Sequence, residues 1–107
     1  MEVCPVKRML ITYTVKPHLS AENQHDIKRV FDELRANDTP GVRYVAFTSD
    51  DGLTFVHLVS IETDTGENPL AQSPAFQAFQ AGVRDRCAEP PVATVLEEVG
   101  SYKVFTA

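Results

Sequence analysis

The sequence predicts one α+β domain whose elements follow the order strand, helix, strand, strand, helix, strand. Its 107 residues hold that pattern once, and each predicted segment has its own hydrophobic period or terminal signal. The run SDDG (49–52) separates two β-rich segments and predicts a tight hairpin at the centre of the chain. A chain of this length is expected to form a single domain, residues 1–107.

The first half is predicted to contain a strand followed by an amphipathic helix. Residues 9–17 (MLITYTVKP) alternate and are rich in β-branched and aromatic side chains, which predicts a strand that ends at Pro17. Ser20 is a good N-cap, and Ile27 and Val30 belong to one apolar stripe. These signals predict a helix from Ala21 to about Ala36.

The central hairpin pairs residues 42–48 with residues 53–61. If Asp51-Gly52 forms a two-residue turn, one face of the hairpin carries a mixed set: Tyr44, Ala46, Thr48, Phe55, His57, Val59 and Ile61. The other face is uniformly apolar: Val45, Phe47, Val56 and Leu58. A three-residue turn would reverse the correspondence between the two strands.

The second half is predicted to contain a helix and a long last strand. Ser73-Pro74 is an N-cap followed by proline at the first helical position. The helix carries its apolar residues at i, i+3 and i+7: Phe76, Phe79 and Val83. It is expected to end near Cys87, and Pro90-Pro91 forbids its continuation. Residues 92–105 form the last predicted strand, longer than the others and broken at Gly100.

This order predicts a ferredoxin-like fold, a four-stranded antiparallel sheet with two helices on one face. The strands are apolar on both faces, so the second face needs a cover that this short chain does not supply. Self-association as a homodimer is the economical solution.

Three runs carry a family resemblance: DDGLTFVHL (50–58), NPLAQSPAFQAFQAGVRDRC (68–87) and PPVATVLEEVGSY (90–102). From Met9 to Phe105 the chain resembles the dimeric α/β-barrel superfamily, which includes antibiotic-biosynthesis-type monooxygenases and stress-responsive barrel proteins. Within it, the chain is most similar to small bacterial proteins with no assigned function. The resemblance implies that two sheets close into one barrel and that the last strand reaches onto the partner.

The resemblance also shows a departure. Members that oxidise polycyclic aromatic substrates without a cofactor are associated with Trp, Asn and Tyr side chains in the cleft. Haem-degrading relatives use an Asn, a Trp and a haem-ligating His. This chain contains no tryptophan, which lowers the expectation of both activities and excludes neither cofactor-free oxidation nor simple binding.

His57 is the candidate catalytic residue, because a neutral imidazole in mid-strand suits a general base or a ligand-orienting donor. The competing interpretation is a core histidine satisfied by a backbone carbonyl or a neighbouring tyrosine. Tyr44 and Tyr13 are candidate ligand-binding residues that could supply hydroxyl groups to the same cavity. The set is completed by two small neighbours that leave room and one aromatic residue: Ala46, Thr48 and Phe55.

Other chemistry is not expected. No metal site is predicted, since no histidine motif exists and Cys4 and Cys87 are not at ligand spacing. No cofactor, haem included, is expected to be bound. Arg84 and Arg86 lie in the last turn of the second helix, where cations complement the helix dipole.

The net charge of −5 argues against nucleic acid or an anionic membrane as a partner. Two widely spaced cysteines and the absence of a signal-peptide pattern predict a cytoplasmic protein.

Two classes of function remain open, and the sequence leaves undecided whether the protein is an enzyme. In the first, a dimeric barrel binds a small, mostly apolar molecule and transforms it by proton or oxygen chemistry, as a monooxygenase-like or isomerase-like enzyme. In the second, the barrel is filled with side chains and the protein is a structural or stress-associated dimer without a ligand. A cavity lined by His57 would favour the first class.

Overall fold

The computed structural model describes residues 6–104 and contains the elements in the predicted order. The strands and α-helices are β1 (Lys7–Val15), α1 (Ser20–Asn37), β2 (Val42–Thr48), β3 (Thr54–Ile61), α2 (Pro74–Arg86) and β4 (Cys87–Leu96). Short 3-10 turns, η1 (Pro17–Leu19) and η2 (Pro69–Gln72), precede the two helices. The sheet order is β2-β3-β1-β4 with every neighbouring pair antiparallel. The predicted ferredoxin-like α+β fold is therefore confirmed.

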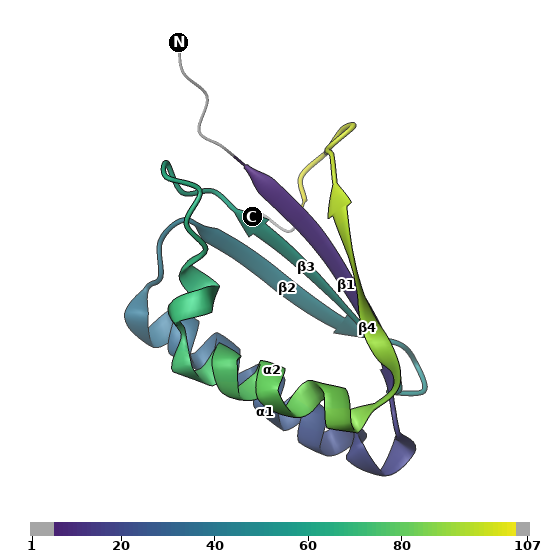
Figure 1. Ribbon diagram of the computed structural model, residues 1–107. Helices are drawn as coiled ribbons and strands as arrows, with labels where there is room; N and C mark the ends of the chain where they lie inside the picture. Colours follow the sequence, from purple (N-terminus) through teal and green to yellow (C-terminus); the bar gives the residue numbers. More distant parts are fainter. Residues whose placement is uncertain (1–5, 105–107) are drawn as a thin grey trace.

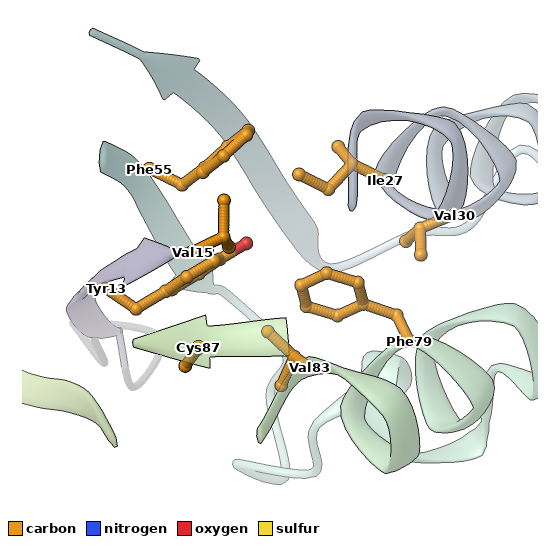
Figure 2. Packing of buried hydrophobic residues seen from close by; sticks show 8 residues of the cluster. All are labelled: Tyr13, Val15, Ile27, Val30, Phe55, Phe79, Val83 and Cys87. Atoms are coloured by element: carbon orange, nitrogen blue, oxygen red, sulfur yellow. The ribbon is translucent and has the colours of Figure 1, made fainter. Parts of the chain in front are cut away.

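Both helices cover the same face of the sheet (Figure 1). Their apolar stripes turn toward the strands and form one core with them, as expected for amphipathic helices. The core residues come from β1, β3, both helices and the start of β4: Tyr13, Val15, Ile27, Val30, Phe55, Phe79, Val83 and Cys87 (Figure 2). Within this core the rings of Tyr13 and Phe55 stack, with their centroids 5.5 Å apart.

The register of the central hairpin is the predicted one. Ala46 lies opposite His57, and Thr48 lies opposite Phe55. The backbone N–H of Ser49 donates to Thr54 at 2.9 Å and closes the turn. Gly52 has φ +73° in this turn, a conformation that L side chains rarely adopt.

The start of the first helix differs from the prediction. Ser20 is the first residue of α1 and not its N-cap; Leu19 holds the cap position without a side-chain hydrogen bond. The hydroxyl group of Ser20 donates instead to the carbonyl oxygen of Gly52. A tertiary contact with the hairpin turn has replaced the local cap. At the second helix the predicted cap is confirmed, because Ser73 accepts a hydrogen bond from the backbone N–H of Phe76.

The last strand also differs from the prediction. β4 begins at Cys87, directly after α2, and ends at Leu96. Pro90-Pro91 therefore lies inside the strand, which an edge position allows because β4 pairs with β1 alone. The register shifts near these prolines. Residues 97–104 are not part of a strand, and Phe105 lies outside the described residues.

The second face of the sheet carries apolar side chains and no helix within residues 6–104 (Figure 1). Strand alternation and register place on it Leu10, Val45, Phe47, Val56, Leu58, Val92 and Leu96. Phe47 is 45% exposed and Val92 is 58% exposed. The two-faced apolar strands of the prediction are therefore present in the structure.

Candidate functional site

A cavity of about 500 Å³ lies between the covered face of the sheet and α2, and its size is typical of small-molecule sites. Its apolar wall comes from β1, β3, α2 and β4: Ile11, Val59, Phe76, Phe79, Val83, Pro91 and Ala93. Its polar wall consists of Tyr13, Tyr44, His57, Gln80 and Arg84. The cavity is thus an apolar space with several polar side chains at one wall. Two of these, Gln80 and Arg84, are exposed.

His57 lies near the middle of β3 with its side chain toward the helices, because the strand alternation that buries Phe55 and Val59 buries it as well. Its side chain is 2% exposed. This burial lowers the pKa of His57 from 6.5 to about 4. The imidazole is therefore neutral near pH 7, with one nitrogen that donates and one that accepts.

Two tyrosines occupy the two ring nitrogens of His57. Tyr13 of β1 places its hydroxyl oxygen 2.8 Å from Nε2, and Tyr44 of β2 places its hydroxyl oxygen 2.5 Å from Nδ1. Burial raises the pKa of both tyrosines, so their hydroxyl groups stay protonated. Both ring nitrogens of His57 are therefore hydrogen-bonded to tyrosine hydroxyl groups of the same cavity wall.

This arrangement contains elements of both sequence interpretations of His57. The ring is satisfied by neighbouring tyrosines, as the core interpretation requires, and it lines a cavity, as the functional one requires. Phe79 of α2 packs near it, with the ring centroids 5.5 Å apart.

The hydrogen bonds continue away from the cavity into the space between the helices. Asn23 of α1 donates from Nδ2 to the hydroxyl oxygen of Tyr13 at 2.9 Å. Arg86 of α2 donates from Nε to Oδ1 of Asn23 at 3.0 Å and from Nη1 to Oδ2 of Asp26 at 2.9 Å. Asn23 is fully buried and Arg86 is 5% exposed. Six side chains thus form one continuous chain, here called the polar chain: Tyr44, His57, Tyr13, Asn23, Arg86 and Asp26.

The sequence interpretation of Arg86 needs correction. It lies in the last turn of α2, as predicted, but its guanidinium group is buried against α1 and is not a solvated cation at the helix end. Asn23 was not predicted at all. A signal existed for both residues, because Asn23 precedes Ile27 by four positions and Arg86 follows Val83 by three, which places each on the apolar stripe of its helix.

The remaining predicted ligand-binding residues lie outside the wall of this cavity. Phe55 is 2% exposed and belongs to the core beside Tyr13. Ala46 packs against the same core, and Thr48 is exposed near the hairpin turn. The open space is found beside Ala93 of β4 and not beside Ala46 or Thr48.

A second hollow of about 570 Å³ lies at one end of the uncovered face. Arg8 and Arg43 line it together with Glu62 and Glu98. These charges pair with one another: Arg8 contacts both glutamates, and Arg43 contacts Glu62 at 3.1 Å. Glu97 also lines the hollow, so three carboxylate groups accompany two guanidinium groups there.

Residues 6–104 contain no group of three or more His, Cys, Asp or Glu side chains that could hold a metal ion. No helix within this range is long and apolar enough to cross a membrane. Cys87 is a free, buried thiol, and Cys4 lies outside the described residues.

The chain has a ferredoxin-like α+β fold, which is similar to that of several solved structures described as antibiotic biosynthesis monooxygenases. Rv0793 from Mycobacterium tuberculosis is 19% identical with a TM-score of 0.71, over 91% of this chain and 98% of that one. A proposed antibiotic biosynthesis monooxygenase from Nitrosomonas europaea is 15% identical with a TM-score of 0.70, over 100% of this chain and 99% of that one.

A third similar structure is a mutant of SnoaB, a cofactor-independent oxygenase from Streptomyces nogalater. It is 17% identical with a TM-score of 0.64, over 90% of this chain and 95% of that one. At these identities the similarity shows the fold alone. No family model matches the chain, and no curated protein matches it.

Proposed function

We propose that this protein binds a small, mostly apolar molecule in the cavity under α2 and transforms it as a cofactor-independent, monooxygenase-like enzyme. The observation that carries this proposal is the pair of tyrosine hydroxyl groups on His57 at the wall of an otherwise apolar cavity. A cavity of about 500 Å³ also counts against the alternative of a side-chain-filled structural dimer. Similarity to a cofactor-independent oxygenase supports the reaction class by analogy of fold.

The chemistry requires a substrate that supplies its own electrons. A methylene group that is conjugated with a ketone through an aromatic ring loses a proton to water at the exposed side of the cavity, beside Gln80 and Arg84. It forms an enolate, whose oxygen gains negative charge. A hydroxyl donor that is already in place stabilises that charge, and Tyr44 is placed for this role. Dioxygen then takes four electrons from the methylene carbon in two steps of two: one oxygen atom becomes the new carbonyl oxygen, and the other leaves as water with the remaining methylene hydrogen and one proton from solvent.

The test measures binding and oxygen uptake with anthrone, a tricyclic ketone that has such a methylene group. We expect saturable binding by calorimetry and oxygen consumption faster than the uncatalysed reaction. Ala93→Phe should fill the cavity and abolish binding. Ala88→Phe is the matched control, since Ala88 lies on the same strand and is exposed but is not part of the wall. Binding that survives Ala93→Phe unchanged would exclude this cavity as the site.

We also propose that the protein is a homodimer whose two copies meet through the uncovered face of the sheet. The support is the apolar character of that face, with Phe47 and Val92 still 45% and 58% exposed. A second copy presents the same apolar surface, so one symmetric contact covers both faces.

Light scattering at micromolar concentration should give twice the chain mass. Phe47→Glu should reduce the mass to that of one chain, because it buries a charge in the contact. Ala81→Glu, on the exposed side of α2, is the control and should remain dimeric. A single-chain mass for the unmodified protein would refute the dimer.

A further inference from the structure

Arg86, the buried arginine of the polar chain, restricts which atom carries the hydrogen in each hydrogen bond of these six side chains. A guanidinium group only donates hydrogen bonds. Nε of Arg86 lies 3.0 Å from Oδ1 of Asn23, and Nη1 lies 2.9 Å from Oδ2 of Asp26. The amide oxygen of Asn23 must therefore face Arg86, which leaves its NH₂ group to face the neighbour on the other side.

That neighbour is the hydroxyl oxygen of Tyr13, 2.9 Å from Nδ2 of Asn23. Because this oxygen accepts from the amide, its own hydrogen is directed to Nε2 of His57, 2.8 Å away. Nε2 is then the nitrogen without a hydrogen, and Nδ1 carries it. The N–H group at Nδ1 donates to the hydroxyl oxygen of Tyr44.

The opposite arrangement leaves a donor without a partner. If Nε2 of His57 carried the hydrogen, the oxygen of Tyr13 would accept from both His57 and Asn23. The hydroxyl hydrogen of Tyr13 would then have no acceptor at a side chain that is 4% exposed. An unpaired buried donor is strongly disfavoured. The preferred arrangement leaves the free hydroxyl hydrogen on Tyr44 instead, a partly exposed side chain at the cavity wall, so the difference in burial selects the direction of the hydrogen bonds.

We propose that Arg86 and Asn23 are positioning residues that keep neutral His57 in its Nδ1–H form and thereby direct the hydroxyl hydrogen of Tyr44 toward the cavity. Within residues 6–104, His57 is the recorded hydrogen-bond partner of the Tyr44 hydroxyl group. Since that oxygen accepts from His57, its hydrogen is available to a ligand. The preferred ligand then has an apolar body and a carbonyl or other acceptor oxygen. This last step rests on the proposed function; the protonation state of His57 does not.

The packing around Arg86 supports this role. Its Cζ atom lies 5.7 Å from the ring centroid of Phe79. A side chain at Gly82 would place its Cβ in collision with Nη1 of Arg86, so the absence of a side chain there makes room for the guanidinium group. Two nitrogens of the group, Nε and Nη1, donate to side chains of α1, while Nη2 is buried without a hydrogen-bond partner.

The first test needs no variant. Long-range ¹H–¹⁵N spectra of the ¹⁵N-labelled protein near pH 7 report which ring nitrogen of each histidine carries a hydrogen. His18 and His25 are exposed and provide internal references. We expect the Nδ1–H form for His57. A predominant Nε2–H form would overturn the proposal.

The second test uses Asn23→Asp to reverse the donor and acceptor roles in the hydrogen bonds of the polar chain. A carboxylate only accepts, so it would accept from both Arg86 and Tyr13. The hydroxyl hydrogen of Tyr13 would then turn away from His57, and the ring hydrogen should move from Nδ1 to Nε2. Gln24→Glu is the matched control, because it makes the same amide-to-carboxylate change one residue away, at a side chain that contacts Ser20. A folded Asn23→Asp protein that keeps the Nδ1–H form would contradict the proposal.

A ligand comparison separates this inference from the proposed function. 1-Indanone and indane have nearly the same shape, and indanone alone has an acceptor oxygen. The unmodified protein should bind indanone at least about tenfold more tightly than indane, and Asn23→Asp should remove this preference. Equal affinities in the unmodified protein would refute the donor role of Tyr44. Failure of both probes to bind would count against the proposed function and leave the spectroscopic result for His57 standing.

Discussion

The face of the sheet that the helices cover contains buried polar groups, whereas the uncovered face contains exposed apolar ones. On the covered face, Asn23, His57 and Arg86 are each at most 5% exposed. On the uncovered face, Phe47 and Val92 remain 45% and 58% exposed. Each face therefore departs from the usual distribution of polar and apolar side chains, and in opposite directions.

The two departures have different physical solutions. Buried polar groups are tolerated when they are hydrogen-bonded, and the polar chain provides partners for its members one after another, except for Nη2 of Arg86, which is buried without one. Exposed apolar side chains are stabilised only when another surface removes them from water, so they indicate a partner outside the chain. The covered face is formed by one chain and holds the candidate ligand site, and the uncovered face is the surface that we propose for contact with a second copy.

Breaking the polar chain at its charged end should have the largest effect on stability. Arg86→Met leaves Oδ1 of Asn23 and the carboxylate of Asp26 without their donor. We expect the free energy of unfolding to fall by about 3 kcal/mol, at the lower end for a broken buried pair because Asp26 is partly exposed. Urea unfolding at matched protein concentration measures this change.

Arg84→Met makes the same substitution two residues away, at an exposed position of α2. It should change the free energy of unfolding by no more than about 0.5 kcal/mol. Equal free energies of unfolding for the two variants would mean that the hydrogen bonds of Arg86 do not stabilise the fold.

The contrast between Arg84 and Arg86 shows which structural features the sequence could predict and which it could not. Hydrophobic periods, the SDDG turn and the Ser73 cap predicted the element order and the hairpin register, because these depend on neighbours along the chain. Arg86 was misassigned because its partners on α1 are fixed by how two helices pack, which local signals do not contain.

A similar limit explains the remaining differences. Tyr13, Tyr44 and His57 were predicted to share one cavity, since alternation places them on one face of the sheet. Asn23 completes their hydrogen bonds from a helix, and no pattern within the strands could reveal it. Pro90-Pro91 was predicted to lie between the second helix and the last strand, yet it lies within β4, because an edge strand tolerates missing N–H groups.

The covered face should also make stability depend on pH. Above about pH 6.5, His57 is neutral in both the folded and the unfolded chain. Below it the unfolded chain binds a proton, and the folded chain does not until about pH 4, the lowered pKa of His57. Stability should therefore fall as the pH falls through this window, by about 2 kcal/mol between about pH 7 and about pH 5.

Urea unfolding at both pH values, at one protein concentration, measures this loss. His57→Gln should remove most of the loss, whatever its effect on stability at pH 7. His18→Gln, at an exposed position, should leave the loss unchanged. If His57→Gln retained the full pH dependence, another group would have to be responsible for it.

The smallest expected effect compares the two faces with one substitution. Val15→Thr places a hydroxyl group in the core at a side chain that is 1% exposed, and it should lower the free energy of unfolding by about 1–2 kcal/mol at every protein concentration. Val56→Thr makes the same change on the uncovered face, where water still reaches a single chain. At concentrations that keep the chain monomeric, its effect should stay within about 0.5 kcal/mol.

If two copies bury this face against each other, the loss should grow as protein concentration rises, because the hydroxyl group then weakens the dimer and not the monomer. Unfolding midpoints measured over a hundredfold range of concentration separate the two cases, and a Val56→Thr effect that does not change with concentration would mean that no second copy covers the face.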